Sequence, residues 1–172
     1  MGRKKKLPLL ESVEITDIAA EGKSLARVDN VVVFVPGVIP GDIVDIQVNR
    51  KRKNYMEGFV VNLKKRSDMY IEPVCEHFGI CGGCKWQHLP YEKQLLYKQK
   101  QVEDNLERIG KIHLPKIRPI IGSQKQYEYR NKLEFTFSAT RWLSDDEIRT
   151  KKEITDRRAL GFHIPGKFDR IK

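Results

Sequence analysis

Three cysteines are the residues of this sequence best suited to chemistry, because they lie within ten positions. They are Cys75, Cys81 and Cys84, and Gly82-Gly83 separates the last two. Cysteines two residues apart can bind one metal centre, and paired glycines allow a tight turn that brings backbone N–H groups close to sulfur. Iron–sulfur clusters normally use four cysteine ligands. The segment therefore indicates an iron–sulfur site with three ligands here and a fourth elsewhere.

The residues alone leave other interpretations of the cysteines open. A tetrahedral zinc site also takes four ligands, and His77 or His88 could supply the fourth. Cys81 and Cys84 could instead form a redox dithiol, although no βαβ pattern surrounds them. Three unrelated buried cysteines fit less well, because a glycine pair is not a core pattern. Each histidine by itself is more typical of a surface or packing residue than of a ligand.

Composition and charge narrow the class of protein. The 172 residues include 33 Lys and Arg against 23 Asp and Glu, a formal net charge of +10. Hydrophobic residues are 40% and charged residues 33%, too apolar for a disordered chain and too polar for a membrane protein. No apolar run approaches the ~20 residues of a membrane helix, and no secretory signal begins the chain. We expect a cytoplasmic protein with no membrane contact and an anionic partner, nucleic acid being the first candidate.

Part of the positive charge is clustered in three short runs. A lone basic run is usually a solvated loop, but three runs within 66 residues on a basic background favour contact with a polyanion. Such binding depends on salt and is not sequence-selective, because it is directed at phosphates. The leading candidates are the second run, Arg50, Lys51, Arg52 and Lys53; the others are Arg3–Lys6 and Lys64–Arg66.

The first part of the chain reads as strands. Val44, Ile46 and Val48 alternate with polar residues, the period of a half-buried strand. Val31–Val35 is a β-branched run between turn signals, and residues 58–63 read as a further strand. Four or five short strands without helical periodicity predict a small closed β-barrel. Phe34 is expected in its core, the alternative being a stacking platform for a base.

The second part mixes helix and strand. A helix is expected to begin at Pro90 and end at Gly110, with an apolar stripe, Leu95, Val102, Leu106 and Ile109, packed on a neighbour. Residues 132–137 alternate as a strand with one apolar face, and 160–164 are its expected hairpin partner. The charged residues 144–158 are expected to form a mobile excursion, and residues 166–172 show no closing element.

Several motifs carry a resemblance to known families. In the strand-rich part, three segments resemble the TRAM domain, a small RNA-binding β-barrel of the OB type: Gly22–Arg27, Val32–Gly37 and Pro40–Asp42. Cys75–His88 resembles the cluster motif of the bacterial RNA uracil-5 methyltransferases that modify large-subunit ribosomal RNA. Tyr129–Phe135 and Gly161–His163 are similar to two strands of that family. The resemblance covers the chain from about Val13 to Lys172.

The resemblance implies a mainly β fold with one long helix. It implies an OB-like TRAM barrel followed by an incomplete central α+β domain with an antiparallel sheet. The expected parts are a basic flexible N-terminus (residues 1–12), the TRAM barrel (13–67) and a central iron–sulfur and RNA-binding domain (73–172) that is truncated at its C-terminal end. The family's third domain binds S-adenosylmethionine and carries the nucleophilic cysteine and general-base glutamate. That domain is expected beyond this chain.

The resemblance also implies a function. The full-length protein would be an S-adenosylmethionine-dependent RNA uracil-5 methyltransferase, most readily of ribosomal RNA, and this chain its non-catalytic RNA-binding part. Cys75, Cys81 and Cys84 would bind a [4Fe-4S] cluster with a fourth cysteine beyond Lys172, so the cluster is expected to be incomplete or lost in this fragment. Arg130 and Lys132 join Arg50–Lys53 as RNA contacts, in a monomer without an obligate protein partner. The alternative is a stand-alone TRAM-type RNA-binding protein with structural zinc.

Overall fold

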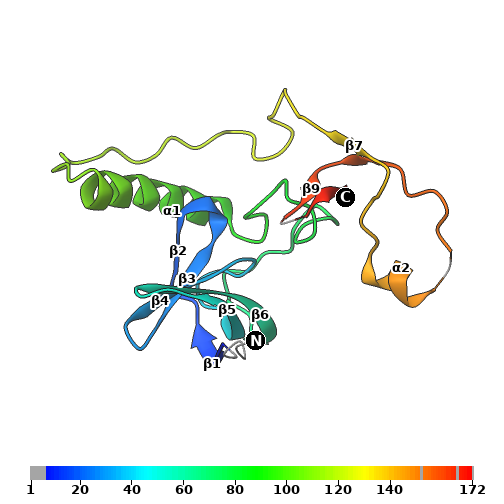
Figure 1. Cartoon of the computed structure of the whole chain (residues 1–172). Helices are drawn as coiled ribbons and strands as arrows, with labels where there is room; N and C mark the ends of the chain where they lie inside the picture. Colours follow the sequence, from blue (N-terminus) through cyan, green and yellow to red (C-terminus); the bar gives the residue numbers. More distant parts are fainter. Residues whose placement is uncertain (1–6, 152, 166, 172) are drawn as a thin grey trace. The chain divides into compact units, whose positions relative to one another are not determined.

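The structure is a computed structural model that describes residues 7–151, 153–165 and 167–171 (Figure 1). The chain divides into two compact units. The first holds Met1–Glu72 and His88–Gly122, and the second holds Pro73–Gln87 and Ser123–Lys172. The helix after Pro90 therefore groups with the strand-rich part, whereas it was expected within the range 73–172.

The first unit is built on one six-stranded sheet, whose order is β1-β5-β6-β4-β3-β2. All neighbouring strands are antiparallel except β4 and β6, which are parallel. A short 3-10 turn, Ala20–Gly22, follows β2. The strands are β1 (Leu9–Glu14), β2 (Asp17–Ile18), β3 (Ser24–Val28), β4 (Val31–Val35), β5 (Ile43–Lys51) and β6 (Tyr55–Lys65).

The two ends of this sheet meet at one stretch of backbone. Strands β1 and β2 stand at opposite ends of the order, yet only Ile15 and Thr16 separate them in the chain. The N–H of Ile15 donates to the Asp42 carbonyl, and the N–H of Thr16 donates to the Leu25 carbonyl, both at 2.9 Å. Irregularities in the β5–β6 register bend the sheet further. The sheet is therefore strongly curved, and full hydrogen-bonded closure into a barrel stays a prediction.

Alternate residues of these strands form the core. Val33, Val35, Val44 and Ile46 are fully buried, and Val48 is 2% exposed. Burying each such side chain stabilises the fold by ~1.5–3 kcal/mol relative to leaving it in water. The strands predicted at residues 31–35, 44–48 and 58–63 are thereby confirmed.

Two expectations for this sheet are wrong. The flexible N-terminus was expected to extend to residue 12, but β1 begins at Leu9, because Leu10 packs on the core and Gln47 Nε2 donates to the Leu7 carbonyl. Residues 1–6 of that range lie outside the described residues. Phe34 was expected in the core, but it is half-buried and is not among the residues packed there. Its neighbours Val33 and Val35 face inward, so strand alternation turns its ring outward.

The predicted helix is present and lies in the first unit. It runs as α1 (Tyr91–Asp104) and continues as a π-helical turn (Asn105–Ile109) that ends at Gly110, whose N–H donates to the Asn105 carbonyl. Lys100 ties the helix to β2 through Asp17, with 2.8 Å between Nζ and Oδ2. Residues 111–122 run back along α1, where the Ile120 N–H donates to Gln99 Oε1 at 2.8 Å (Figure 1).

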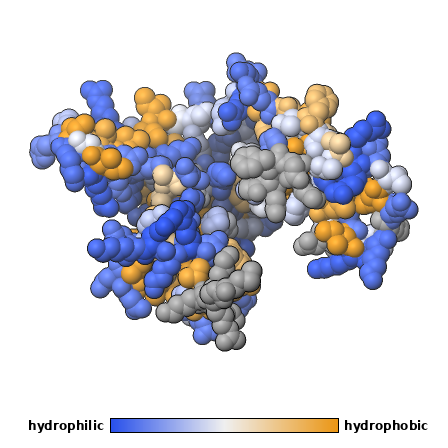
Figure 2. Space-filling view, in the orientation of Figure 1, coloured by the Kyte–Doolittle hydropathy of each residue, from blue (hydrophilic) through white to orange (hydrophobic). Residues whose placement is uncertain are grey.

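The apolar stripe of this helix is only partly covered. Leu95 and Leu106 are half-buried, but Val102 and Ile109 are 54% and 79% exposed. Figure 2 shows apolar side chains at the surface of α1 among hydrophilic ones. The expectation that the whole stripe packs on a neighbour is therefore wrong for these two residues within the described part of the chain.

The second unit consists of short elements. Strand β7 (Thr136–Ser138) pairs antiparallel with β8 (Ala159–Gly161), and β9 (His163–Ile164) pairs antiparallel with β10 (Lys167–Ile171). The predicted hairpin is present, but its first strand begins later than predicted. Leu133 and Phe135 are about half exposed, and alternation without a covering surface does not hold a strand.

Two further features of the second unit differ from expectation. Strand β10 is a closing element, although residues 166–172 were expected to have none; Gly166 and Lys172 lie outside the described residues. The expected mobile excursion contains α2 (Asp145–Arg149). There the Arg141 guanidinium donates to Glu147 Oε1 at 2.6 Å, and this contact lowers the pKa of the Glu147 carboxyl to about 2.

Candidate nucleic-acid interface

The basic run of residues 50–53 forms one exposed hairpin. Arg50 and Lys51 end β5, and the turn to β6 closes where the Arg52 N–H donates to the Tyr55 carbonyl at 2.9 Å. Arg50 pairs with Glu57 across the strands, with 3.5 Å between Nη1 and Oε2. All four cations are exposed, and within the described residues Lys51 and Lys53 have no acidic partner. The structure thus places these four predicted contacts together on what we call the basic hairpin, Arg50–Lys53.

The basic run at residues 64–66 differs from the basic hairpin, because two of its cations form ion pairs with aspartates of the first unit. Lys64 pairs with Asp45 at 3.4 Å, and Arg66 pairs with Asp42 at 3.4 Å. The Ser12 N–H, with help from the Asn62 amide and Lys64, lowers the pKa of the Asp45 carboxyl. These ion pairs therefore help to stabilise the fold.

Arg130 and Lys132 lie in the second unit, before β7. Both are exposed, and the segment is not a strand, contrary to the similarity with a family strand. Lys132 pairs with Glu134 at 3.0 Å. Two exposed side chains of this kind are flexible, so the structure leaves their part in binding a prediction.

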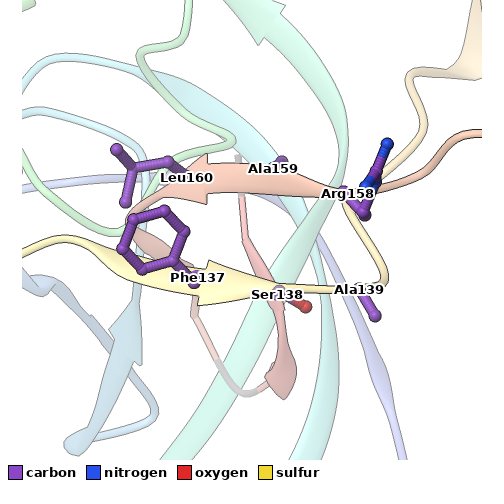
Figure 3. A pocket seen from close by; sticks show the side chains of 6 residues that line it. All are labelled: Phe137, Ser138, Ala139, Arg158, Ala159 and Leu160. Carbon is purple, nitrogen blue, oxygen red and sulfur yellow. The ribbon is translucent and has the colours of Figure 1, made fainter.

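An open, shallow hollow lies on the β7–β8 hairpin (Figure 3). Phe137 and Leu160 lie side by side there, 84% and 53% exposed, and they are opposite one another in the strand register. Arg158, at one end, is held by Asp156 at 2.8 Å. Its lining is mostly apolar, and the Ser138 hydroxyl within it accepts from the Thr140 N–H at 3.0 Å, so we assign the hollow no chemistry.

The cysteine segment is a turn-rich loop in which all three thiols are free. Cys75 and Cys84 are exposed, and Cys81 is half-buried. The Gly83 N–H donates to Cys81 Sγ at 3.3 Å, the kind of contact that sulfur ligands of iron commonly receive. The donor set therefore suits an iron–sulfur cluster. Among the described residues, however, no three His, Cys, Asp or Glu side chains are gathered closely enough to hold a metal ion.

Gly82 has a packing role that sequence reasoning missed. Its N–H donates to the His163 carbonyl at 3.1 Å, and a Cβ at this position would lie 2.5 Å from that oxygen. The glycine therefore lets the cysteine loop meet β9. Gly82 and His163 are far apart in the chain, so the sequence around Gly82 gives no sign of this contact other than the glycine itself.

The histidines proposed as zinc ligands have other surroundings. His77 Nε2 lies 3.4 Å from Glu76 Oε1. His88 is 3% exposed in the first unit and its ring lies edge-on to Tyr70, and burial lowers the pKa of this imidazole. These placements give the zinc alternative no support.

Of three outward aromatic residues near the basic hairpin, Tyr55 and Phe59 were not predicted as functional, and Phe34 was considered as a stacking platform only as the alternative to a core position. Tyr55, Glu57 and Phe59 alternate with the buried Met56 and Gly58 along β6. The alternation along β6 could have predicted that these side chains face outward. Phe34 lies in an unbroken apolar run, Val31–Val35, in which both faces of the strand look alike. The structure alone shows that its ring faces outward.

Part of the six-stranded sheet matches the model of a known family. Residues 11–61 match the family model described as the TRAM domain. This part of the chain is a TRAM domain. The chain is 56% identical over 154 residues to an uncharacterized RNA methyltransferase of Bacteroides thetaiotaomicron, covering 90% of this chain and 34% of the relative. It is 36% identical over 156 residues to the 23S rRNA (uracil(1939)-C(5))-methyltransferase RlmD of Albidiferax ferrireducens, covering 88% and 30%.

The TRAM-containing chain therefore spans about a third of the length of the curated relatives it matches. Among solved structures, the Pyrococcus abyssi tRNA (uracil-54, C5)-methyltransferase in complex with S-adenosyl-L-homocysteine matches with a TM-score of 0.49 at 21% identity. The match covers 94% of this chain and 30% of that one. In the part of the chain that the structure describes, every helix is too short or too polar to cross a membrane.

Proposed function

We propose that this chain is the RNA-binding part of an S-adenosylmethionine-dependent RNA uracil-5 methyltransferase that acts on large-subunit ribosomal RNA. The observation that carries the proposal is the TRAM match over residues 11–61 within a longer similarity to a 23S rRNA (uracil-C5)-methyltransferase. A fold alone does not imply function, but this similarity extends over both compact units.

The role of these residues is to hold RNA. The basic hairpin supplies exposed cations on a rigid strand pair, and phosphates are their natural ligands because contact releases condensed counterions. Arg130 and Lys132 are proposed as further contacts from the second unit. The protein acts as a cytoplasmic monomer with RNA as its partner and no membrane contact.

The methyl transfer itself is assigned to the part of the relatives that this chain does not span. S-adenosylmethionine supplies the methyl group there, and no residue of this chain takes a catalytic role. The target uracil has to leave its stack before C5 can react, so an RNA-binding unit that grips the flanking strand assists the chemistry by positioning.

The cysteine loop is proposed to carry an iron–sulfur cluster in the full-length protein. Cys75, Cys81 and Cys84 are three ligands, and the fourth is a cysteine outside residues 1–172. A cluster held this way ties the loop to another segment of the chain, in the manner of a structural metal site.

Metal analysis tests the cluster. Iron, zinc and acid-labile sulfide are measured on the full-length protein and on residues 1–172, both purified without oxygen. We expect about four irons and four sulfides in the full-length protein and a loss in the shorter chain. Cys84→Ser in the full-length protein should lower both contents. One zinc per shorter chain, unchanged in the longer protein, would instead establish the zinc-stabilised RNA-binding protein.

Methyl transfer tests the function. The full-length protein is incubated with S-adenosylmethionine and with ribosomal RNA from a strain that lacks the gene, and nucleosides are analysed by mass spectrometry. We expect 5-methyluridine in the large-subunit RNA, and less of it when residues 1–67 are deleted. Methylation of transfer RNA alone would show that the proposed substrate is wrong. Binding of RNA without methyl transfer would refute the enzyme assignment.

A further inference from the structure

The outer face of the TRAM sheet presents aromatic rings beside the basic hairpin. Val33 and Met56 are core residues at 0% and 5% exposure, so strand alternation turns Phe34, Tyr55 and Glu57 to the opposite face. The parallel register pairs Phe34 with Glu57 and Val32 with Tyr55, which makes these side chains neighbours across β4 and β6.

Two of the rings contact each other, and the third lies farther along β6. Phe34 and Tyr55 meet edge to face, with centroids 5.8 Å apart and an interplanar angle of 70°. Phe59 follows on the same face of β6 and is 46% exposed. Four residues along a strand place Phe59 ~13 Å from Tyr55. The core does not include Phe34 or Phe59, so hydrophobic packing of the sheet does not account for them.

The surroundings of the rings are basic. Glu57 is the carboxylate between Tyr55 and Phe59, and Arg50 pairs with it at 3.5 Å. Arg27, exposed on β3, stands opposite Val32 in the register. Lys51, Arg52 and Lys53 project from the same hairpin. Apolar rings bordered by cations, of which Lys51 and Lys53 have no acidic partner among the described residues, suit a partner that has flat faces and a negative backbone.

We propose that Phe34, Tyr55 and Phe59 form a stacking face for single-stranded RNA, with the basic hairpin along its phosphates. Unpaired bases stack on aromatic side chains, whereas a duplex hides its base faces. The inference rests on the proposed RNA-binding function, and it adds the face of the sheet, the residues and the strandedness of the ligand.

Fluorescence anisotropy of the 172-residue chain tests the stacking face. The probes are a labelled single strand of about 12 nucleotides, within the site size of an OB-type fold, and the matching duplex. Phe59→Leu and Tyr55→Leu keep apolar bulk but remove a ring, and each should weaken single-strand binding about tenfold. Phe59→Trp should retain it. The matched control is Phe137→Leu, an exposed phenylalanine of the second unit, which should bind as wild type.

The outcomes separate the two proposals. Urea midpoints first establish that each variant is folded; Phe59 is about half exposed, so its replacement should hardly change them. If the wild-type chain binds neither probe at low salt, the RNA-binding function fails. If it binds RNA but both leucine variants bind as wild type, or the duplex binds as tightly, the stacking face is refuted while the function stands.

Photo-crosslinking with 5-bromouridine should label Tyr55 or Phe59, and labelling confined to the second unit would refute the stacking face.

Discussion

At the scale of single residues, Asp42 organises the turn between β4 and β5 and the end of β6. It is fully buried, and its carboxylate accepts from the Ile39 N–H at 3.0 Å, the Ser67 N–H at 2.8 Å and Arg66 Nη1 at 3.4 Å. The two backbone donors and the one cation offset the free-energy cost of removing this carboxylate from water. Gly41, with a φ of +89°, brings the backbone into the required turn.

Asp42→Ala should therefore destabilise the first unit. The change leaves two backbone N–H groups without their acceptor, and the expected loss is about 3 kcal/mol in the free energy of unfolding. Urea unfolding followed by circular dichroism measures it, with the exposed Asp68→Ala as the control. A loss below about 1 kcal/mol would contradict this account of the turn.

His88 makes stability depend on pH. Burial lowers the pKa of its imidazole from the ordinary value of 6.5, while the nearby Asp42 opposes the shift. The unfolded chain then binds a proton more readily than the folded one, so stability is complete above about pH 6.5 and declines as pH falls toward the folded pKa.

The expected decline is up to about 1.4 kcal/mol per pH unit. Urea unfolding at about pH 7.5 and about pH 5.5 measures it, and His88→Gln should reduce the difference between the two. His163→Gln is the control, since that side chain is exposed. An equal pH dependence in wild type and His88→Gln would show that another group is responsible.

At the scale of elements, β5 and β6 hold the TRAM sheet together. They are its longest strands, and Gly58 lies where β6 crosses the core side chains of β5. A Cβ on Gly58 would lie 2.5 Å from Ile46 Cγ2 and 2.8 Å from the Gln47 carbonyl oxygen. One contact is with backbone, which cannot move aside without disturbing the ladder.

Gly58→Ala should thus destabilise the sheet by about 2 kcal/mol through overpacking. The measurement is the urea midpoint of the 172-residue chain. Val61→Thr, on the same strand and 51% exposed in wild type, keeps the β-branched shape and should stay within about 0.5 kcal/mol. A neutral Gly58→Ala would mean that the strand pair can separate locally without cost.

At the scale of the whole molecule, the distribution of positive charge bears on the proposed RNA binding. A net charge of +10 attracts polyanions, but only cations without acidic partners contribute fully to binding. Lys51 and Lys53 meet that condition among the described residues, whereas Lys64 and Arg66 are paired with acids of the sheet. The basic hairpin is therefore expected to dominate the salt dependence contributed by the first unit.

A double variant, Lys51→Gln with Lys53→Gln, tests this expectation. If both cations contact phosphates, the slope of log affinity against log salt for single-stranded RNA should fall by about 1.4, or ~0.7 for each contact. Lys116→Gln with Lys125→Gln removes the same charge from exposed positions elsewhere and serves as the control. Equal slopes in the two double variants would show general attraction by net charge.

The sequence by itself determined the features that depend on nearby residues. The strands at 31–35 and 44–48, the start of α1 after Pro90, the end of the following helical turn at Gly110 and the basic hairpin all follow from local periodicity and turn chemistry. The resemblance to a TRAM domain rested on motifs within the same stretch, and the match to residues 11–61 agrees with it.

Only the tertiary structure decided what covers each face. Phe34 was expected inside and lies outside, because both faces of an apolar strand look alike until its neighbours are placed. Val102 and Ile109 were expected to pack and are exposed, while His88 was expected at the surface or in packing and is buried beside Tyr70. Burial is a property of segments distant in the chain, and local sequence patterns do not contain it.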